Sequence, residues 1–103
     1  MNDRLLGMLG LSIRAGKTVF GAFLTEKAID EGRAKLVIAS EDIGSSNRRK
    51  IQAKCENENV SLIFYSTTEE ISRLAGKKNV PVVCVCDEGF AAAIVKIYGG
   101  ARK

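Results

Sequence analysis

Hydrophobic positions along the chain follow two spacings, and the spacing changes from one stretch to the next. Some stretches carry apolar residues three and four apart, which is the spacing of one face of an α-helix. Others are short apolar runs, and those at 36–39 and 81–86 show no polar alternation, which is typical of strands covered on both faces. The pattern predicts helices at 3–13, 22–31, 45–58, 67–76 and 90–98, and strands at 18–20, 36–39, 60–65 and 81–86.

Residues at the ends of these segments support the same boundaries. Asp3, or Asn2 before it, is the candidate N-cap of the first helix, and Gly16 ends that helix. The segment 67–70, Thr-Thr-Glu-Glu, resembles a capping box that opens the fourth helix. Because helices and strands alternate, we predict an α/β fold, a three-layer α/β/α sandwich with a central four-stranded mixed sheet.

The length of the chain bounds its organisation. With 103 residues, 46% of them hydrophobic, the chain is long enough for one domain with its own core. We expect this domain to span residues 1–98, and residues 99–103 to form a loose basic tail.

Composition excludes several classes of chemistry. The chain has no histidine, so the commonest general base and metal ligand is absent. Ser-His and Cys-His nucleophile pairs are therefore excluded, and so are histidine-containing zinc sites. We expect a binding protein rather than an enzyme, with no cofactor and no metal.

Three cysteines without a Cys-X-X-Cys motif indicate a reducing cytoplasm rather than a disulfide framework. Cys84 and Cys86 share one face of a strand, where core packing is favoured over a metal site. We expect no signal peptide, and no run of about 18 apolar residues exists that could cross a membrane. A cytoplasmic monomer with no membrane partner is the resulting prediction.

The net charge of +4 is concentrated in the first half of the chain. Residues 1–54 hold ten Lys and Arg against six Asp and Glu, whereas residues 55–103 hold six of each. The excess suits an anionic partner such as nucleic acid, although many proteins carry as much for solubility. The densest basic cluster, at 48–50, is either a nucleic-acid footprint or a solvated helix face.

One segment imitates a phosphate-binding motif. Residues 15–18, Ala-Gly-Lys-Thr, match the end of a P-loop, but that motif requires a glycine where the chain has Leu11. It also requires a strand before it and a helix after it, the reverse of the predicted order. We therefore interpret Gly16 as a helix C-cap.

Gly21, at the mouth of the second predicted helix, is a better phosphate candidate. A glycine there lets a phosphate approach the free backbone N–H groups of the helix. Arg14, Lys17 and Lys27 are close to it in sequence. The alternative is an ordinary turn between a strand and a helix.

A series of short motifs runs in order through nearly the whole chain. The motifs are Leu9-Gly10-Leu11, Arg14-Ala15-Gly16-Lys17, Gly21, Lys27-Ala28-Ile29, 34–39, Asp42, Ser46-Asn47, Cys55, Ala75-Gly76-Lys77 and 87–91. In this order they resemble the L7Ae/L30e superfamily of kink-turn-binding ribosomal proteins, and most closely its small stand-alone bacterial members of the YlxQ type. The ordered series is specific, although no single motif is.

The resemblance implies a sandwich fold that binds structured RNA, with ribosome-associated proteins as a second class of partner. Family members insert the N-terminus of the second helix beside tandem G·A pairs of a kink-turn, and a loop before the last strand covers an extruded nucleotide. Carried over to this chain, the RNA-binding residues are Arg14, Lys17, Gly21, Ala22, Phe23 and Lys27 around the helix, and Lys77, Lys78, Asn79 and Val80 in the loop.

The chain departs from the family signature at the second helix. The signature reads G-x-N-E-x-T-K, and this chain matches it at Gly21 and Lys27 but has Phe23 in place of Asn and Leu24 in place of Glu. Neither side chain can hydrogen-bond a guanine edge. Phe23 either stacks on a base or packs in the core, and we expect Leu24 in the core.

Two functions follow. The first is an RNA-binding protein that contacts structured ribosomal RNA. In that case Lys77 and Lys78 of the loop contact the RNA backbone; the alternative for this loop is a solvated turn. The alternative is a protein-interaction module that kept the fold but lost specific kink-turn reading. In that case Phe23 and Leu24 would form an exposed apolar patch beside Val80.

Overall fold

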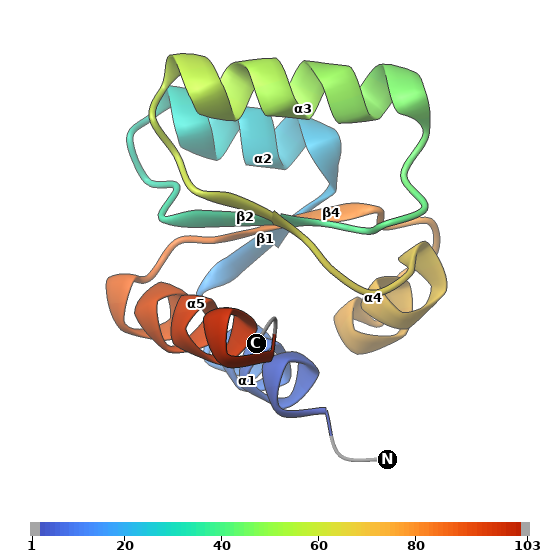
Figure 1. Cartoon of the computed structure of the whole chain (residues 1–103), viewed down its shortest axis with the longest axis vertical. Helices are drawn as coiled ribbons and strands as arrows, with labels where there is room; N and C mark the ends of the chain where they lie inside the picture. The colour runs from blue at the N-terminus through green and yellow to red at the C-terminus, as the bar shows by residue number, and fades with distance from the viewer. Residues whose placement is uncertain (1–2, 102–103) are drawn as a thin grey trace.

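A computed structural model of the chain describes residues 3–101, in which helices and strands alternate from end to end (Figure 1). The order of elements is the one that the hydrophobic spacing predicts. The helices are α1 (Arg4–Arg14), α2 (Gly21–Asp30), α3 (Ser45–Asn57), α4 (Thr68–Ala75) and α5 (Glu88–Ala101), and the strands are β1 (Thr18–Phe20), β2 (Leu36–Ala39), β3 (Leu62–Phe64) and β4 (Val82–Val85).

The strands form one mixed sheet in the order β1-β4-β2-β3. β2 and β3 run parallel, because the α3 crossover returns the chain in the same direction, and β4 lies antiparallel to both of its neighbours. The register places Val37 opposite Cys84 in the centre of the sheet and Phe20 opposite Val83 at its edge. The ends of β2 and β3 and the start of β4 therefore meet at one end of the sheet.

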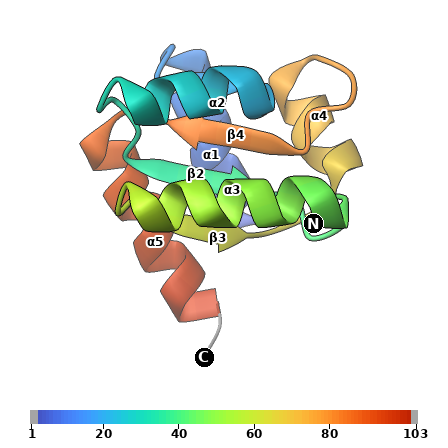
Figure 2. The ribbon, with the colours of Figure 1, turned by 90° about the horizontal axis from the view of Figure 1, so that it is seen from above.

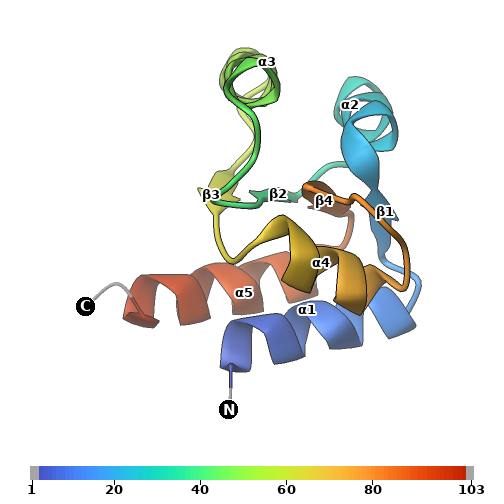
Figure 3. The same ribbon diagram turned by 90° about the vertical axis from the view of Figure 1, so that its right-hand side faces the viewer.

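Helices cover both faces of this sheet, with α2 and α3 on one side and α1, α4 and α5 on the other (Figures 1 and 3). All residues of β2 and β4 are buried, as predicted for strands covered on both faces. Successive side chains point to opposite layers. Val37, Ala39, Val82 and Cys84 pack under α2 and α3, and Leu36, Ile38, Val83 and Val85 pack against the other three helices. The predicted α/β/α sandwich is confirmed.

Two helix starts are capped by the side chains that the sequence indicated. Asp3 Oδ1 accepts from the backbone N–H of Leu6 at 3.0 Å, and its Oδ2 accepts from the Tyr65 hydroxyl at 2.9 Å. Thr67 Oγ1 accepts from the backbone N–H of Glu70 at 3.1 Å. Asp3 therefore caps α1 and also ties it to the residue that follows β3.

The end of the chain differs from the prediction. α5 continues through Ala101, so the loose tail is wrong for residues 99–101; residues 102 and 103 lie outside the described residues. The glycines at 99 and 100 favoured a tail, since each weakens a helix by about 1 kcal/mol relative to alanine. The helix is anchored just before them, where Tyr98 packs edge-on against Tyr65 with ring centroids 6.3 Å apart. No helix in the described part of the chain has the length and apolar character to span a bilayer.

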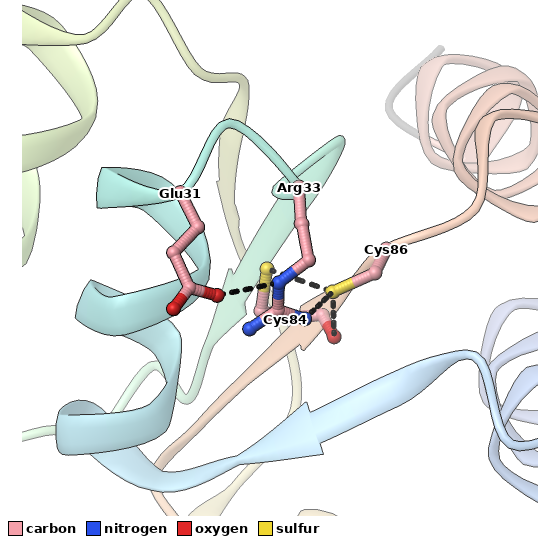
Figure 4. Close-up of polar contacts among 4 residues, drawn as sticks. All are labelled: Glu31, Arg33, Cys84 and Cys86. Atoms are coloured by element: carbon pink, nitrogen blue, oxygen red, sulfur yellow. Dashed lines mark hydrogen bonds and ion pairs between the residues drawn. The ribbon is translucent and has the colours of Figure 1, made fainter.

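The chain has three free thiols, and all of them lie on the side of the sheet that α2 and α3 cover. Cys84 is buried, as predicted, and so is Cys55, whereas Cys86 is partly exposed. The Sγ atoms of Cys84 and Cys86 are 3.9 Å apart, and Arg33, held by Glu31, directs Nη1 at Cys86 Sγ across 4.0 Å (Figure 4). Burial raises the pKa of the Cys55 thiol to about 11 and raises that of Cys84 as well. In the part of the chain that the structure describes, no group of three or more His, Cys, Asp or Glu could hold a metal ion.

We expect Cys86 alone to react quickly with a thiol reagent such as DTNB at mildly alkaline pH. Cys55 and Cys84 are buried with raised pKa values, so they stay protonated and react only when the protein opens. Counting modified thiols against time measures this, and Cys86→Ser is expected to remove the fast phase. Rapid modification of all the thiols in the folded protein would contradict the packing described.

Candidate nucleic-acid interface

Strand β1 leads directly into α2, and its pairing with β4 sets the position of the helix start. Phe20 ends β1 opposite Val83, so the first turn of α2 lies beside the loop that enters β4. Figure 2 shows the blue start of α2 next to α4 and the orange loop that follows it. We call residues 20–24 and 76–80 together the end face.

The loop at 76–80, one half of the end face, is held by hydrogen bonds to Ser72 of α4 and by the burial of Val80. The side chain of Val80 is buried, with 4% of its surface exposed, and its backbone N–H donates to Ser72 Oγ at 2.8 Å. The backbone N–H of Lys77 donates to the carbonyl oxygen of Ser72 at 3.1 Å. Val80, predicted to be a surface contact, is therefore a core residue that holds the loop, and its burial removes it from the predicted apolar patch.

The loop that lies beside the start of α2 carries two cations, Lys77 and Lys78. Lys77 places its Nζ 5.9 Å from the centroid of the Phe20 ring, in a cation–π arrangement on the side of the sheet that α1, α4 and α5 cover. Lys78 follows it and is exposed, as is Asn79. Neither lysine forms an ion pair with another described residue. The positive charge of the loop is thus available to a ligand.

The start of α2 lacks a side-chain cap. Its N-cap residue is Phe20, and no side chain accepts a hydrogen bond there. Gly21 adopts a φ of +89°, a conformation that favours glycine, and a Cβ at this position would meet no atom within 4 Å. The first turn, which includes the exposed Ala22, has no acidic residue. Its N–H groups carry the positive end of the helix dipole, so an anion is favoured here.

Phe23 and Leu24 project from this turn with 78% and 43% of their surfaces exposed. The reason is periodicity: α2 buries Thr25, Ala28 and Ile29, which are three and four apart, and positions 23 and 24 lie outside that stripe. The core packing predicted for Leu24 is wrong, and the core interpretation of Phe23 is excluded. The two positions at which the family signature has Asn and Glu are therefore exposed and apolar.

An open groove of about 550 Å³ lies on the α4 side of the loop. It is lined by Asp42, Thr68, Glu69, Ser72, Arg73, Lys77, Lys78 and Asn79. Asp42 accepts hydrogen bonds from the backbone N–H (2.9 Å) and the hydroxyl (2.8 Å) of Thr68, and these bonds lower the pKa of Asp42. Arg73 and Glu69 form an ion pair at 3.1 Å. The cations of this groove that no carboxylate engages are the two loop lysines.

Lys17 lies at the other end of β1, and Arg14 precedes it as the last residue of α1. The carbonyl oxygen of Lys17 accepts from the backbone N–H of Cys86 at 2.8 Å, which places it beside the end of β4, whereas α2 begins beside the start of β4. The extended chain from Lys17 to Gly21 covers about 13 Å. Lys17 is therefore about one strand length from Gly21, whereas the Arg14 guanidinium reaches back along α1 to Gly10, beside Leu74 of α4. Contact of Arg14 and Lys17 with RNA stays a prediction. Lys27 is exposed on α2, about 9 Å along the helix from Gly21.

The basic cluster at 48–50 is partly engaged within the fold. The Arg48 guanidinium lies 3.9 Å from the centroid of the Phe64 ring, which joins α3 to β3. One turn further on, Lys54 pairs with Asp30 of α2 at 2.6 Å. These contacts favour a role for this side of α3 in holding the layer together.

Comparison with known proteins places this geometry in a family. The family model described as ribosomal protein L7Ae/L30e/S12e/Gadd45 family matches residues 3–95. The chain belongs to this family. It is 37% identical over 90 residues to the RNA-binding protein YlxQ of Bacillus subtilis (strain 168), which covers 87% of this chain and 90% of the relative. It is 28% identical over 98 residues to the RNA-binding protein YlxQ of Enterococcus faecium, which covers 95% and 94%. The predicted superfamily and YlxQ-type resemblance is confirmed.

Two solved structures have the same L7Ae-type fold. A protein with unknown function from Bacillus halodurans C superposes with a TM-score of 0.90 at 28% identity, over 95% of this chain and 99% of that one. The Giardia lamblia 15.5kD RNA binding protein superposes with a TM-score of 0.77 at 18% identity, over 97% and 89%. The second similarity is one of fold.

Sequence reasoning missed two residues that build the end face of this L7Ae-family protein. The hydrophobic pattern assigns Phe20 only to a strand, and nothing in the sequence pairs it with Lys77. The second is Ser72, a polar residue next to the apolar Ile71 of α4, whose position in the sequence is the one signal of its role. A buried hydroxyl needs a partner, and Ser72 finds two, the carbonyl oxygen of Thr68 and the backbone N–H of Val80.

Replacing Gly21 with alanine is expected to lower the free energy of unfolding by about 1–2 kcal/mol, because residues with a Cβ are strained at positive φ. Gly7→Ala is the matched control. Gly7 lies inside α1 with open space around it, so alanine there is expected to be neutral or to stabilise by up to about 1 kcal/mol. Chemical denaturation measures both variants, and equal effects would contradict the described start of α2.

Proposed function

We propose that this protein binds structured RNA and that the end face is its contact surface. The observation that carries the proposal is that the uncapped start of α2 lies beside the loop entering β4, whose two lysines pair with no carboxylate of the described residues. RNA phosphates are bound by such cations and by the N–H groups of helix starts. Membership of the family and the RNA-binding relatives support the same function.

The chemistry of the end face suits the RNA backbone better than base edges. Lys77 and Lys78 supply charge, and the first turn of α2 supplies backbone donors. Positions 23 and 24 supply no side-chain donor or acceptor for a guanine edge. We therefore propose that the protein recognises a bent or interrupted RNA helix, of which a kink-turn in ribosomal RNA is the leading case, since RNA is read mostly where helical pairing is broken.

We also propose where and how the protein acts. Its three cysteines are free thiols, which suits the reducing cytoplasm, and its lack of histidine suits a role without catalysis. We propose that it acts as a monomer on ribosomal RNA, beside ribosome-associated proteins.

A kink-turn duplex is expected to bind more tightly than a fully paired duplex of the same composition. Both affinities should fall steeply as salt rises, because phosphate contacts release counterions. Fluorescence anisotropy at low and high salt measures the two affinities. Equal affinity for the two RNAs would contradict the proposed preference for a kink-turn. Binding to neither RNA would contradict the proposal that RNA is the partner.

Lys77→Ala and Lys78→Ala are each expected to weaken RNA binding and to reduce the salt slope by about 0.7–0.9 for each phosphate that the variant no longer neutralises. Lys96→Ala, which removes an exposed charge from α5, outside the end face, is the matched control and should leave the slope unchanged. Lys77→Arg should restore binding, because it restores the charge. An equal decrease in affinity in all three alanine variants would show that net charge, and not the end face, sets the affinity.

A protein-interaction module is the second candidate, because Phe23 and Leu24 are exposed and apolar. This candidate predicts that the purified protein binds none of these RNAs even at low salt. RNA binding that depends on Lys77 and Lys78 would exclude it as the sole function.

A further inference from the structure

Phe23 is the most exposed large apolar side chain among the described residues, at 78%. Phenylalanine has no polar group that favours exposure, and its ring is normally buried. The fold does not require a phenylalanine here, since α2 is held to the sheet by Thr25, Ala28 and Ile29 on its other side. The exposed ring is therefore available to a ligand.

The surroundings of Phe23 define the chemistry of that ligand. Lys27, four residues further along α2, and Glu26, three residues further along, both neighbour Phe23 on the helix surface. The loop that carries Lys77 and Lys78 enters β4 beside the helix start. The first turn of α2 contains no acidic residue. A ligand that fits both the ring and the cations has a flat apolar face and negative charge. A nucleotide has both properties, with its base on the ring and its phosphate near Lys27 or the free N–H groups of the first turn.

We propose that Phe23 is the platform on which one unpaired nucleobase of the bound RNA stacks, an inference that rests on the function proposed above. Stacking needs only the face of the base, so it tolerates any base and needs no hydrogen-bonding side chain at positions 23 and 24. The protein then selects RNA for an unpaired nucleotide beside a helix rather than for a guanine edge. Leu24, half-exposed next to Phe23, adds apolar surface beside the ring.

Affinity for a duplex carrying a short bulge of unpaired uridines tests the platform, with the same duplex made abasic in the bulge and the fully paired duplex as comparisons. Phe23→Ala is expected to weaken binding to the bulged duplex by about 5- to 150-fold, the equivalent of about 1–3 kcal/mol. Phe23→Leu should weaken it as much, because it keeps the apolar character but not the ring. Phe23→Trp should retain the affinity. Because position 23 is exposed, none of the variants should change the unfolding midpoint.

A matched pair of tryptophan variants reports stacking directly. The chain has no tryptophan, so Phe23→Trp introduces a single fluorophore, and a stacked base is expected to quench it. Val95→Trp places the same fluorophore at an exposed position of α5 and should show no quenching.

The outcomes separate the platform from RNA binding itself. Two results together would support the platform. The wild-type protein binds the abasic bulge more weakly than the intact bulge, and the Phe23→Ala variant binds the two bulges with equal affinity. Wild-type affinity in Phe23→Leu, or equal binding of wild type to the abasic and the intact bulge, would overturn the platform while RNA binding stands. If wild type binds none of the RNAs, the proposed function fails and the platform fails with it.

Discussion

The antiparallel pairing of the three-residue strand β1 with β4 determines where everything else at the end face lies. β4 is buried between β1 and β2, so its position is set by the core of the whole sheet. Phe20 lies opposite Val83, and α2 therefore begins beside the loop that enters β4. The same register carries Lys17 to the other end of β4, about one strand length from the start of α2.

Rigidity is the second property of this surface. The loop at 76–80 is tied to α4 through Ser72 and closed by the buried Val80, and Asp42 ties the loop after β2 to the start of α4 through Thr68. A surface held in this way loses little conformational freedom when a ligand binds, which favours affinity. The loop lysines and the exposed apolar side chains of α2 are thus held in position before a ligand binds.

The order of helices and strands was predictable because each element carries the spacing of its own geometry. The buried run at 36–39 and the cap at Asp3 are local signals, and both hold in the structure. Leu24 was misplaced because its burial depends on which side of α2 meets the sheet, and an apolar residue next to the buried stripe looks the same in sequence. The helical glycines at 99 and 100 are a similar case, since packing at Tyr98 outweighs their low propensity.

The candidate site was harder to predict because it is made by contacts between distant segments. Motif resemblance brought together 21–27 and 77–80, and the structure places the start of α2 beside the loop that enters β4. It could not reveal that Val80 is buried or that Lys17 lies at the other end of β1, since both depend on tertiary contacts. The exposure of Phe23, which changes how the site can act, required the orientation of α2.

The central claim is that the end face is the RNA-binding surface, and NMR tests it most directly. Amide chemical shifts of the isotope-labelled protein are recorded as a kink-turn RNA is added. The account predicts that the largest changes fall on residues 20–24 and 76–80, with the exposed side of α5 unchanged. Changes concentrated on α5, or on Lys17 at the other end of β1, would contradict it.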